Sequence, residues 1–182
     1  MTDLGLETHH VGHRVKRTFG FIDLSGFTRY GNVHGDDQAV EQLSGFRAIV
    51  RSVGAATGVR VAKWLGDGAM LVGLDPIEMM SAMLDIVRRA ENQKLALALH
   101  GGMVEGNVIL FEGDDHIGVA VNLAARLADT AEAGQILAPV EMLPGVERTE
   151  AFVGAVRVQG FNDPIEVADL TRAVALVESN NL

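Results

Sequence analysis

The sequence contains no cysteine among its 182 residues, which excludes disulfide bonds and thiolate metal sites. No apolar run approaches the roughly 18 residues that a helix needs to cross a bilayer. Positive charge is scarce, because 15 Lys and Arg against 24 Asp and Glu leave a net charge of −9. This balance argues against nucleic acid or a membrane surface as a partner. The N-terminus lacks the features of a signal peptide, and we expect a cytoplasmic protein.

What is present is the composition of one globular domain. Hydrophobic residues make up 48% of the chain and charged residues 21%, and this length is enough to bury a core. We expect a flexible lead-in over residues 1–16, a single domain over 17–175 and a short tail over 176–182. A regulatory domain that is not part of this chain is a possible further partner.

The spacing of apolar residues predicts the order of the elements. Helices are expected over 36–56, 76–93 and 118–129. The apolar residues expected on the inner face of the second helix are Ile77, Met80, Met83, Leu84 and Val87. The expected strands are 17–24, a hairpin with arms at 59–61 and 70–74, 95–104 paired with 108–111, and later 135–138, 152–158 and 165–170. The order β-α-β-β-α-β, followed by a C-terminal β extension, matches a ferredoxin-like α+β fold. Such a fold has an antiparallel sheet with helices on one face.

Two aspartates stand where a strand gives way to a glycine-containing turn: Asp23 and Asp67. Each by itself has a structural explanation, because Asp often caps a helix or forms a hairpin turn. The first strand should lie beside the hairpin, however, so both carboxylates can project from one edge of the sheet. Hard oxygen ligands of this kind suit Mg²⁺ or Mn²⁺. Two such ions lie about 3.5–4 Å apart in in-line phosphoryl chemistry.

Four further polar residues are candidates for binding a nucleotide. Lys63 lies in an apolar stretch, where it either extends to solvent or donates to a base. Asn122 and Arg126 share a helix face beside the buried stripe; they form a solvated edge, or they bind a ribose hydroxyl and a phosphate. Asp115 precedes that helix and could simply cap it or hold a turn.

Five segments, in this order, resemble the catalytic domain of class III nucleotidyl cyclases, both adenylate and guanylate. The resemblance covers about residues 18–170. Its segments are Phe21–Thr28, Lys63–Gly68, Leu99–Val104, Asp115–Arg126 and Val158–Val167. Each segment is weak evidence by itself, but five in series leave little room for chance.

The resemblance implies a metal and phosphate site in the first half of the chain. Asp23 and Asp67, with the backbone carbonyl of Leu24, would hold two Mg²⁺ or Mn²⁺ ions per site. Backbone amides that follow Asp23, including those of Phe27 and Thr28, would cradle the triphosphate.

The resemblance also implies roles for the four nucleotide-binding candidates. Lys63 and Asp115 would recognise adenine, Asn122 would orient the ribose, and Arg126 would stabilise charge on the α-phosphate. Guanylate cyclases typically carry Glu at the Lys63 position and a small residue at the Asp115 position, so ATP is the expected substrate.

The implied activity is that of an adenylate cyclase, in which the ribose 3′-hydroxyl attacks the α-phosphorus to give cyclic AMP and pyrophosphate. Sites in this family lie between two domains, so one chain that carries both residue sets implies a head-to-tail homodimer. Gln159 stands where many members have a Lys that meets the triphosphate. This departure bears on ATP affinity and leaves a catalytically weak nucleotide-binding dimerisation module as one alternative. A guanylate or dual-specificity cyclase is the other alternative.

Overall fold

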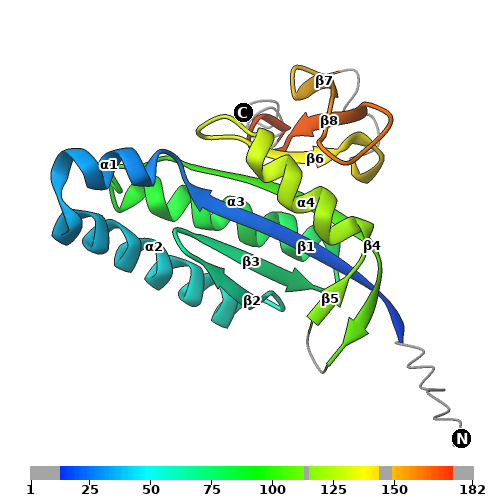
Figure 1. The fold of residues 1–182 in the computed structure, drawn as a ribbon, viewed down its shortest axis with the longest axis horizontal. Coiled ribbons are helices and arrows are strands. Elements are labelled where there is room, and N and C mark those ends of the chain that lie inside the picture. Colours follow the sequence, from blue (N-terminus) through cyan, green and yellow to red (C-terminus); the bar gives the residue numbers. More distant parts are fainter. Residues whose placement is uncertain (1–12, 113–114, 144–148, 174–182) are drawn as a thin grey trace, which may run out of the picture.

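The computed structural model of the protein describes residues 13–112, 115–143 and 149–173. Helices lie on both sides of one eight-stranded sheet (Figure 1). In chain order the elements are β1 (Arg14–Leu24), α1 (Phe27–His34), α2 (Asp36–Ala56), β2 (Arg60–Leu65), β3 (Gly68–Gly73), α3 (Pro76–Asn92), β4 (Leu99–Phe111), β5 (Asp115–Ile117), α4 (Val119–Thr130), β6 (Ile136–Pro139), the 3₁₀ turn η1 (Val140–Met142), β7 (Phe152–Val156) and β8 (Ile165–Asp169). No helix in these described ranges is both long and apolar enough to span a membrane.

The sheet has the order β2-β3-β1-β4-β6-β8-β7, and β5 pairs with β4 outside that path. Strand β1 lies between β3 and β4 and is antiparallel to both. Strand β4 is parallel to β6, the first strand of the C-terminal extension. This topology confirms the predicted α+β fold with a βαββαβ core and a β extension.

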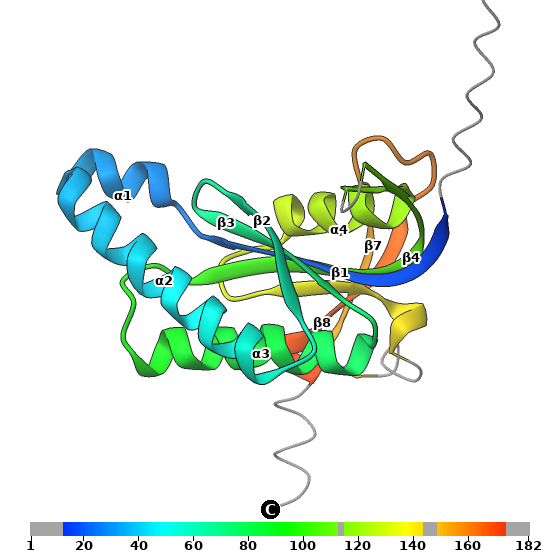
Figure 2. The same ribbon diagram turned by 90° about the horizontal axis from the view of Figure 1, so that it is seen from below.

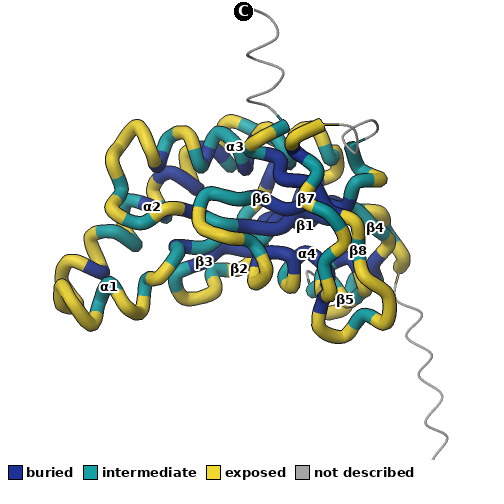
Figure 3. The backbone as a smooth tube through the Cα atoms, turned by 90° about the horizontal axis from the view of Figure 1, so that it is seen from above, coloured by how far each residue is buried: buried dark blue, intermediate teal, exposed yellow. Residues whose placement is uncertain are grey.

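Alternation along β1 divides the core into two clusters. Ile22 and Leu24 pack with residues of α2 and α3, whereas Phe19 and Phe21 point to the other face and pack with residues of α4. Figure 2 shows α2 and α3 on one side of the sheet and α4 on the other, and Figure 3 shows the buried strands between them. The expectation that helices cover only one face was therefore wrong.

Close approach of α4 to the sheet depends on Gly102 of β4. A Cβ built at Gly102 would lie 2.3 Å from the carbonyl oxygen of Ala124 and 2.5 Å from the backbone nitrogen of Ala128. Both atoms belong to the helix backbone, so no side-chain rotation could relieve the overlap. This glycine lets α4 rest directly on β4.

Three sequence predictions about individual elements need correction. Residues 95–104 and 108–111 do not form two paired strands, because β4 runs unbroken and pairs along its length with β1 from Arg14 to Leu24. The end of β4 pairs instead with β5. Strand β1 begins at Arg14, three residues before the predicted start. Helix α1 was not predicted; it has only eight residues, none of them fully buried, which is too short a segment to reveal a helical period in the sequence.

The buried face of α3 also differs from the prediction. Ile77 was expected on the inner face but is 67% exposed. The fully buried stripe is Met79, Ala82, Met83, Ile86 and Ala90. Gly20 of β1 explains why this face of α3 is buried. A Cβ at position 20 would lie 2.7 Å from the sulfur of Met83 and 3.0 Å from that of Met79. Because Gly20 has no side chain, the flexible side chains of the two methionines can pack directly against the backbone of β1.

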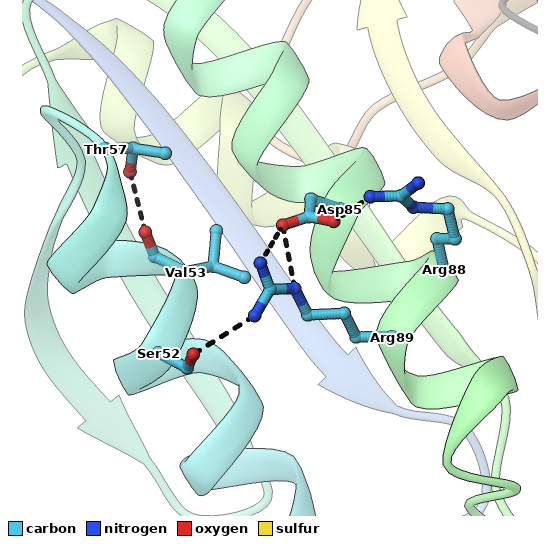
Figure 4. Close-up of polar contacts among 6 residues, drawn as sticks. All are labelled: Ser52, Val53, Thr57, Asp85, Arg88 and Arg89. Carbon is cyan, nitrogen blue, oxygen red and sulfur yellow. Dashed lines mark hydrogen bonds and ion pairs between the residues drawn. The ribbon is translucent and has the colours of Figure 1, made fainter.

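Polar contacts hold α3 at its start and against α2. Asp75 caps α3 by accepting from the amides of Ile77 (2.7 Å) and Glu78 (3.2 Å), with Pro76 at the first helical position. Figure 4 shows the link to α2: Arg89 Nε donates to Asp85 Oδ2 (2.8 Å), and Arg89 Nη1 donates to Ser52 Oγ (3.1 Å).

Candidate active site

The two candidate metal-binding aspartates lie at the same end of the sheet. Asp23 is the last residue but one of β1 and pairs with Gly68 of β3, and Asp67 is in the turn that precedes Gly68. The amide of Leu24 donates to Asp23 Oδ1 (3.0 Å) and lies 3.4 Å from the carbonyl oxygen of Asp67. A Cβ at Gly68 would lie 2.8 Å from Asp23 Oδ1. The absence of a side chain at position 68 therefore leaves room for the Asp23 carboxylate.

The surroundings of Asp23 disfavour the charged form of its carboxyl group. Burial raises the pKa of Asp23 above its ordinary value, and the nearby Asp67 carboxylate raises it further. The hydrogen bond from the Leu24 amide and the proximity of His100 act in the opposite direction. The Asp67 carboxylate thus repels a partly buried Asp23 carboxylate, and a bound divalent cation would remove the repulsion.

A hollow of about 220 Å³ adjoins Asp23. Its polar lining includes His100 of β4 and Asp129 of α4, and His100 Nδ1 lies 2.9 Å from the carbonyl oxygen of Ala128. Sequence analysis missed both residues. Asp129 could have been found from its i,i+3 spacing to Arg126, whereas His100 reaches Asp23 only through the register of β1 and β4.

The donor set fits a hard divalent cation that is also bound by a phosphate. Its atoms are carboxylate oxygens and a backbone carbonyl, which Mg²⁺ and Mn²⁺ prefer. Among the described residues, no group of three or more His, Cys, Asp and Glu side chains could hold a metal by itself. The pair Asp23 and Asp67 therefore leaves several coordination positions for other oxygens, as Mg²⁺ sites with substrate phosphates do.

Phe27 and Thr28 open helix α1, directly after β1 and Asp23. Gly26 precedes them in the left-handed conformation (φ 74°), and no side chain caps the helix. Phe27 packs against the core, whereas Thr28 is exposed. The first-turn N–H groups of a helix have no intrahelical partner, so this end of α1 offers donors to an anion next to the aspartate pair.

Lys63 and Asp115 form an ion pair between β2 and β5. They are 52 positions apart, and both side chains are about half exposed (51% and 47%). Asp115 lies on a strand, and the cap position of α4 is Gly118, so the capping alternative for Asp115 was wrong. The structure brings a strong donor and a strong acceptor side by side.

Asn122 and Arg126 lie on the exposed flank of α4, as predicted. They line a second hollow of about 660 Å³ together with Gln159 and Asn162 of the segment between β7 and β8. Arg126 Nη1 donates to Asp129 Oδ2 at 3.0 Å. The predicted residues thus fall into three groups: Asp23 with Asp67, Lys63 with Asp115, and Asn122 with Arg126.

Neither of these two hollows contains all three groups. The hollow beside Asp23 contains none of Lys63, Asp115, Asn122 or Arg126. The second hollow contains neither aspartate of the pair. Only Ala125 of α4 lines both.

Comparison with known sequences gives relatives but no family model, since none matches the chain. An uncharacterised protein of Mycobacterium bovis is 34% identical over 152 residues, which are 83% of this chain and 40% of that protein. The pH-sensitive adenylate cyclase of Mycobacterium tuberculosis is 29% identical over 120 residues, 66% of this chain and 30% of that protein. The chain therefore spans less than half the length of the curated relatives that it matches.

Comparison with solved structures gives a consistent fold. The adenylyl cyclase CyaB from P. aeruginosa superposes with a TM-score of 0.72 at 23% identity, covering 86% of this chain and 94% of that chain. An adenylate/guanylate cyclase/hydrolase from Silicibacter pomeroyi has a TM-score of 0.74 at 22% identity, with coverage of 87% and 97%. At these identities the structures show that the fold is shared.

Proposed function

Because the chain belongs, by fold and by sequence relationship, to the class III nucleotidyl cyclase catalytic domains, we propose that it is an adenylate cyclase that makes 3′,5′-cyclic AMP and pyrophosphate from ATP. The observation that carries this proposal is the pairing of Asp23 with Asp67, where burial and mutual repulsion raise the pKa of Asp23. Such a pair is poised to bind divalent cations beside a polyphosphate.

Asp23, Asp67 and the carbonyl of Leu24 would hold two Mg²⁺ or Mn²⁺ ions. Bound there, the cations would activate the 3′-hydroxyl and neutralise charge on the phosphates. The uncapped start of α1 at Phe27 and Thr28 would supply backbone donors to the triphosphate.

Lys63 and Asp115 are matched to the edge of adenine. Adenine presents a ring-nitrogen acceptor next to an exocyclic amine donor. The Lys63 ammonium would donate to the first and the Asp115 carboxylate would accept from the second. Guanine presents the opposite polarity at these positions, so both contacts would be mismatched, and the mismatch would discriminate strongly once the bound base covers the two side chains.

Asn122 and Arg126 would act on the reacting part of the nucleotide. The Asn122 amide would hold the ribose so that its 3′-oxygen is in line with the α-phosphorus. The Arg126 guanidinium, released from its exposed contact with Asp129, would stabilise the negative charge that develops on the α-phosphate oxygens. Gln159 and Asn162 line the same hollow and would face this nucleotide.

Two copies of the chain in head-to-tail arrangement would complete each site, because neither hollow that the described residues form beside Asp23 or Arg126 contains all three groups. One copy would supply Asp23 and Asp67, and the other would supply the base, ribose and phosphate contacts. Large exposed apolar side chains on β2, β5 and the start of α4 are consistent with a partner surface there: Leu65, Ile117 and Val119.

The test is cyclic nucleotide production by the purified protein, with ATP and GTP in parallel and with Mg²⁺ and Mn²⁺ each, over a range of protein concentration. We expect cyclic AMP, with specific activity that rises with protein concentration. Product from neither nucleotide at high concentration would contradict the proposal and favour a nucleotide-binding dimerisation module.

A guanylate or dual-specificity cyclase is the second candidate. It is favoured by the structural neighbour from Silicibacter pomeroyi, which is named as an adenylate/guanylate cyclase/hydrolase. Equal or faster turnover of GTP in the same assay would establish it.

A further inference from the structure

The turn that carries Asp67 has a geometry that one peptide bond controls. It is a two-residue loop, because Leu65 pairs with Gly68. Gly66 has a positive φ of 69°, and Asp67 is not among the described non-glycine residues with positive φ. Glycine with positive φ at only the first central position is the pattern of a type II′ turn. Rotation of the Gly66–Asp67 peptide would convert it to type I′ and force Asp67 to positive φ.

Arg47 of α2 holds that peptide. Its Nη2 donates to the carbonyl oxygen of Gly66 at 2.9 Å, across 19 positions of sequence. That carbonyl belongs to the peptide whose rotation separates the two turn types. The hydrogen bond therefore sets ψ of Gly66 and φ of Asp67 together, and with them the direction in which the Asp67 side chain leaves the backbone.

The indole of Trp64 positions the Arg47 guanidinium. The Cζ atom of Arg47 lies 5.0 Å from the centroid of the Trp64 ring, within the range of a cation–π contact. The ring is itself fixed by an edge-to-face contact with Phe46 at 6.4 Å. Arg47 Nε is buried without a hydrogen-bond partner among the described residues, so the ring and the turn carbonyl are the contacts that locate the guanidinium.

We propose that Arg47 is a positioning residue for the active site: stacked on Trp64, it locks the Gly66–Asp67 peptide and so aims the Asp67 carboxylate at Asp23. This inference rests on the proposed function, in which Asp67 binds metal. Arg47 touches neither substrate nor metal and acts only through the turn. Its loss should lower metal affinity and turnover, while recognition of the base is preserved.

Arg51 provides a matched control on the same helix. Its Cζ lies 5.2 Å from the centroid of the same Trp64 ring, so Arg51→Ala removes the same charge and a comparable stacking contact. No hydrogen bond from Arg51 to the turn is found in the described part of the chain. Arg47→Ala and Arg51→Ala therefore differ in the contact to Gly66.

The first measurement is made without metal or nucleotide, on ¹⁵N-labelled protein. In Arg47→Ala we expect the amide signals of Gly66, Asp67 and Gly68 to shift or broaden, because the peptide can then rotate. In Arg51→Ala the same signals should stay within the line width of wild type. Unchanged turn signals in Arg47→Ala would overturn the proposal whatever the enzyme does.

The second measurement follows free Mn²⁺ by its EPR signal as protein is added, and turnover of ATP in parallel. We expect Arg47→Ala to weaken Mn²⁺ binding about tenfold, the lower end of the range for residues that orient metal ligands. Turnover should fall similarly, with KM for ATP within about twofold. Arg47→Lys should recover part of the loss. If the amide signals of the turn shift or broaden in Arg47→Ala but its Mn²⁺ affinity equals that of wild type, the proposal is wrong.

The outcomes separate this inference from the proposed function. Wild-type protein that binds Mn²⁺ through an Arg47-dependent turn but makes no cyclic nucleotide would contradict the proposed function alone. Wild-type protein that binds no Mn²⁺ would contradict the metal assignment, and the backbone signals would then decide the role of Arg47.

Discussion

Asp23 is surrounded by groups from three other parts of the chain. Asp67 comes from the β2–β3 turn, His100 from β4 and Asp129 from α4, and all three influence the Asp23 pKa. A glycine at position 68 leaves room for the carboxylate. The chemistry of this residue is therefore a product of strand register and helix placement, which bring together groups up to about a hundred positions apart.

Asp23→Asn tests this environment through stability. A carboxyl whose folded-state pKa is raised above its ordinary value of 3.8 stabilises the fold when protonated, and that stability is lost as pH rises through the raised pKa. Asn resembles the protonated form, so metal-free Asp23→Asn should melt at a higher temperature than wild type at neutral pH. The two proteins should converge well below the ordinary pKa.

Mn²⁺ should reverse that order in the same thermal melts, because wild type gains binding free energy and the variant does not. Cyclic AMP production by Asp23→Asn should fall more than about 100-fold, since even residues that merely orient ligands cost 10–100-fold. A variant that Mn²⁺ stabilises as strongly as wild type would show that Asp23 is not a ligand.

At the scale of elements, two packing arrangements decide where the site residues lie. Helix α4 rests on β4 at Gly102, and this contact places Asn122 and Arg126 on the free flank of the helix. Helices α2 and α3 are joined by Ser52, Asp85 and Arg89 (Figure 4), and α2 in turn carries Arg47. Neither arrangement involves a residue that would touch a nucleotide.

Gly102→Ala should destabilise the protein by about 1–3 kcal/mol, the usual cost of overpacking a core, because the new methyl group meets the backbone of α4. Gly20→Ala is the control: its Cβ would meet the sulfur atoms of Met83 and Met79, which can move. Urea unfolding of both variants provides the comparison. A loss no larger in Gly102→Ala than in Gly20→Ala would show that α4 shifts without cost.

Asp85→Asn should weaken the contact between α2 and α3. Hydrogen bonds from Arg88 and Arg89 lower the pKa of Asp85, so its stabilisation is present above the ordinary pKa and is lost as pH falls through the lowered one. We expect a loss of about 0.5–1 kcal/mol at neutral pH, as for a small surface ion-pair network, and no difference from wild type in acid. Glu91→Gln, an exposed position of α3, controls for the change in charge. If Glu91→Gln lowers the free energy of unfolding by the same amount, Asp85 has no specific role in the contact between α2 and α3.

At the scale of the whole molecule, the candidate site residues are divided between two separate hollows and an ion pair, whereas the proposed reaction needs one site. The hollow beside Asp23 and the hollow beside Arg126 meet only at Ala125. A second copy in head-to-tail arrangement would bring the first of one chain to the second of the other. The unit that binds ATP would then be the dimer.

Mixing two inactive variants tests this arrangement. Asp67→Ala and Arg126→Ala should each lose activity by more than about 100-fold, but a mixed dimer keeps one complete site. Random exchange at equal amounts should therefore restore about a quarter of wild-type activity, since half of the dimers are mixed and each has one of two sites. If subunits exchange and no mixture regains activity, the shared site is wrong.

The sequence by itself determined the α+β fold, the order of the βαββαβ core and the presence of the Asp23, Asp67, Asn122 and Arg126 side chains at element ends and on an exposed helix flank. Apolar periodicity and turn glycines are local features of the sequence, so they can be recognised without a structure. The continuous β4, the face of α3 and the helix on the second face of the sheet were decided by tertiary structure, because strand pairing and glycine contacts outweighed local apolar spacing.

Tertiary structure also decided which groups meet. Three sets of contacts join residues on different elements. They are the ion pair of Lys63 with Asp115, the proximity of His100 and Asp129 to Asp23, and the hydrogen bond from Arg47 to Gly66. The spacing of residues along the chain does not predict these contacts, since they depend on the register of the sheet and on how each helix packs against it. The chemistry of the side chains belongs to the sequence, and their combination into a site belongs to the fold.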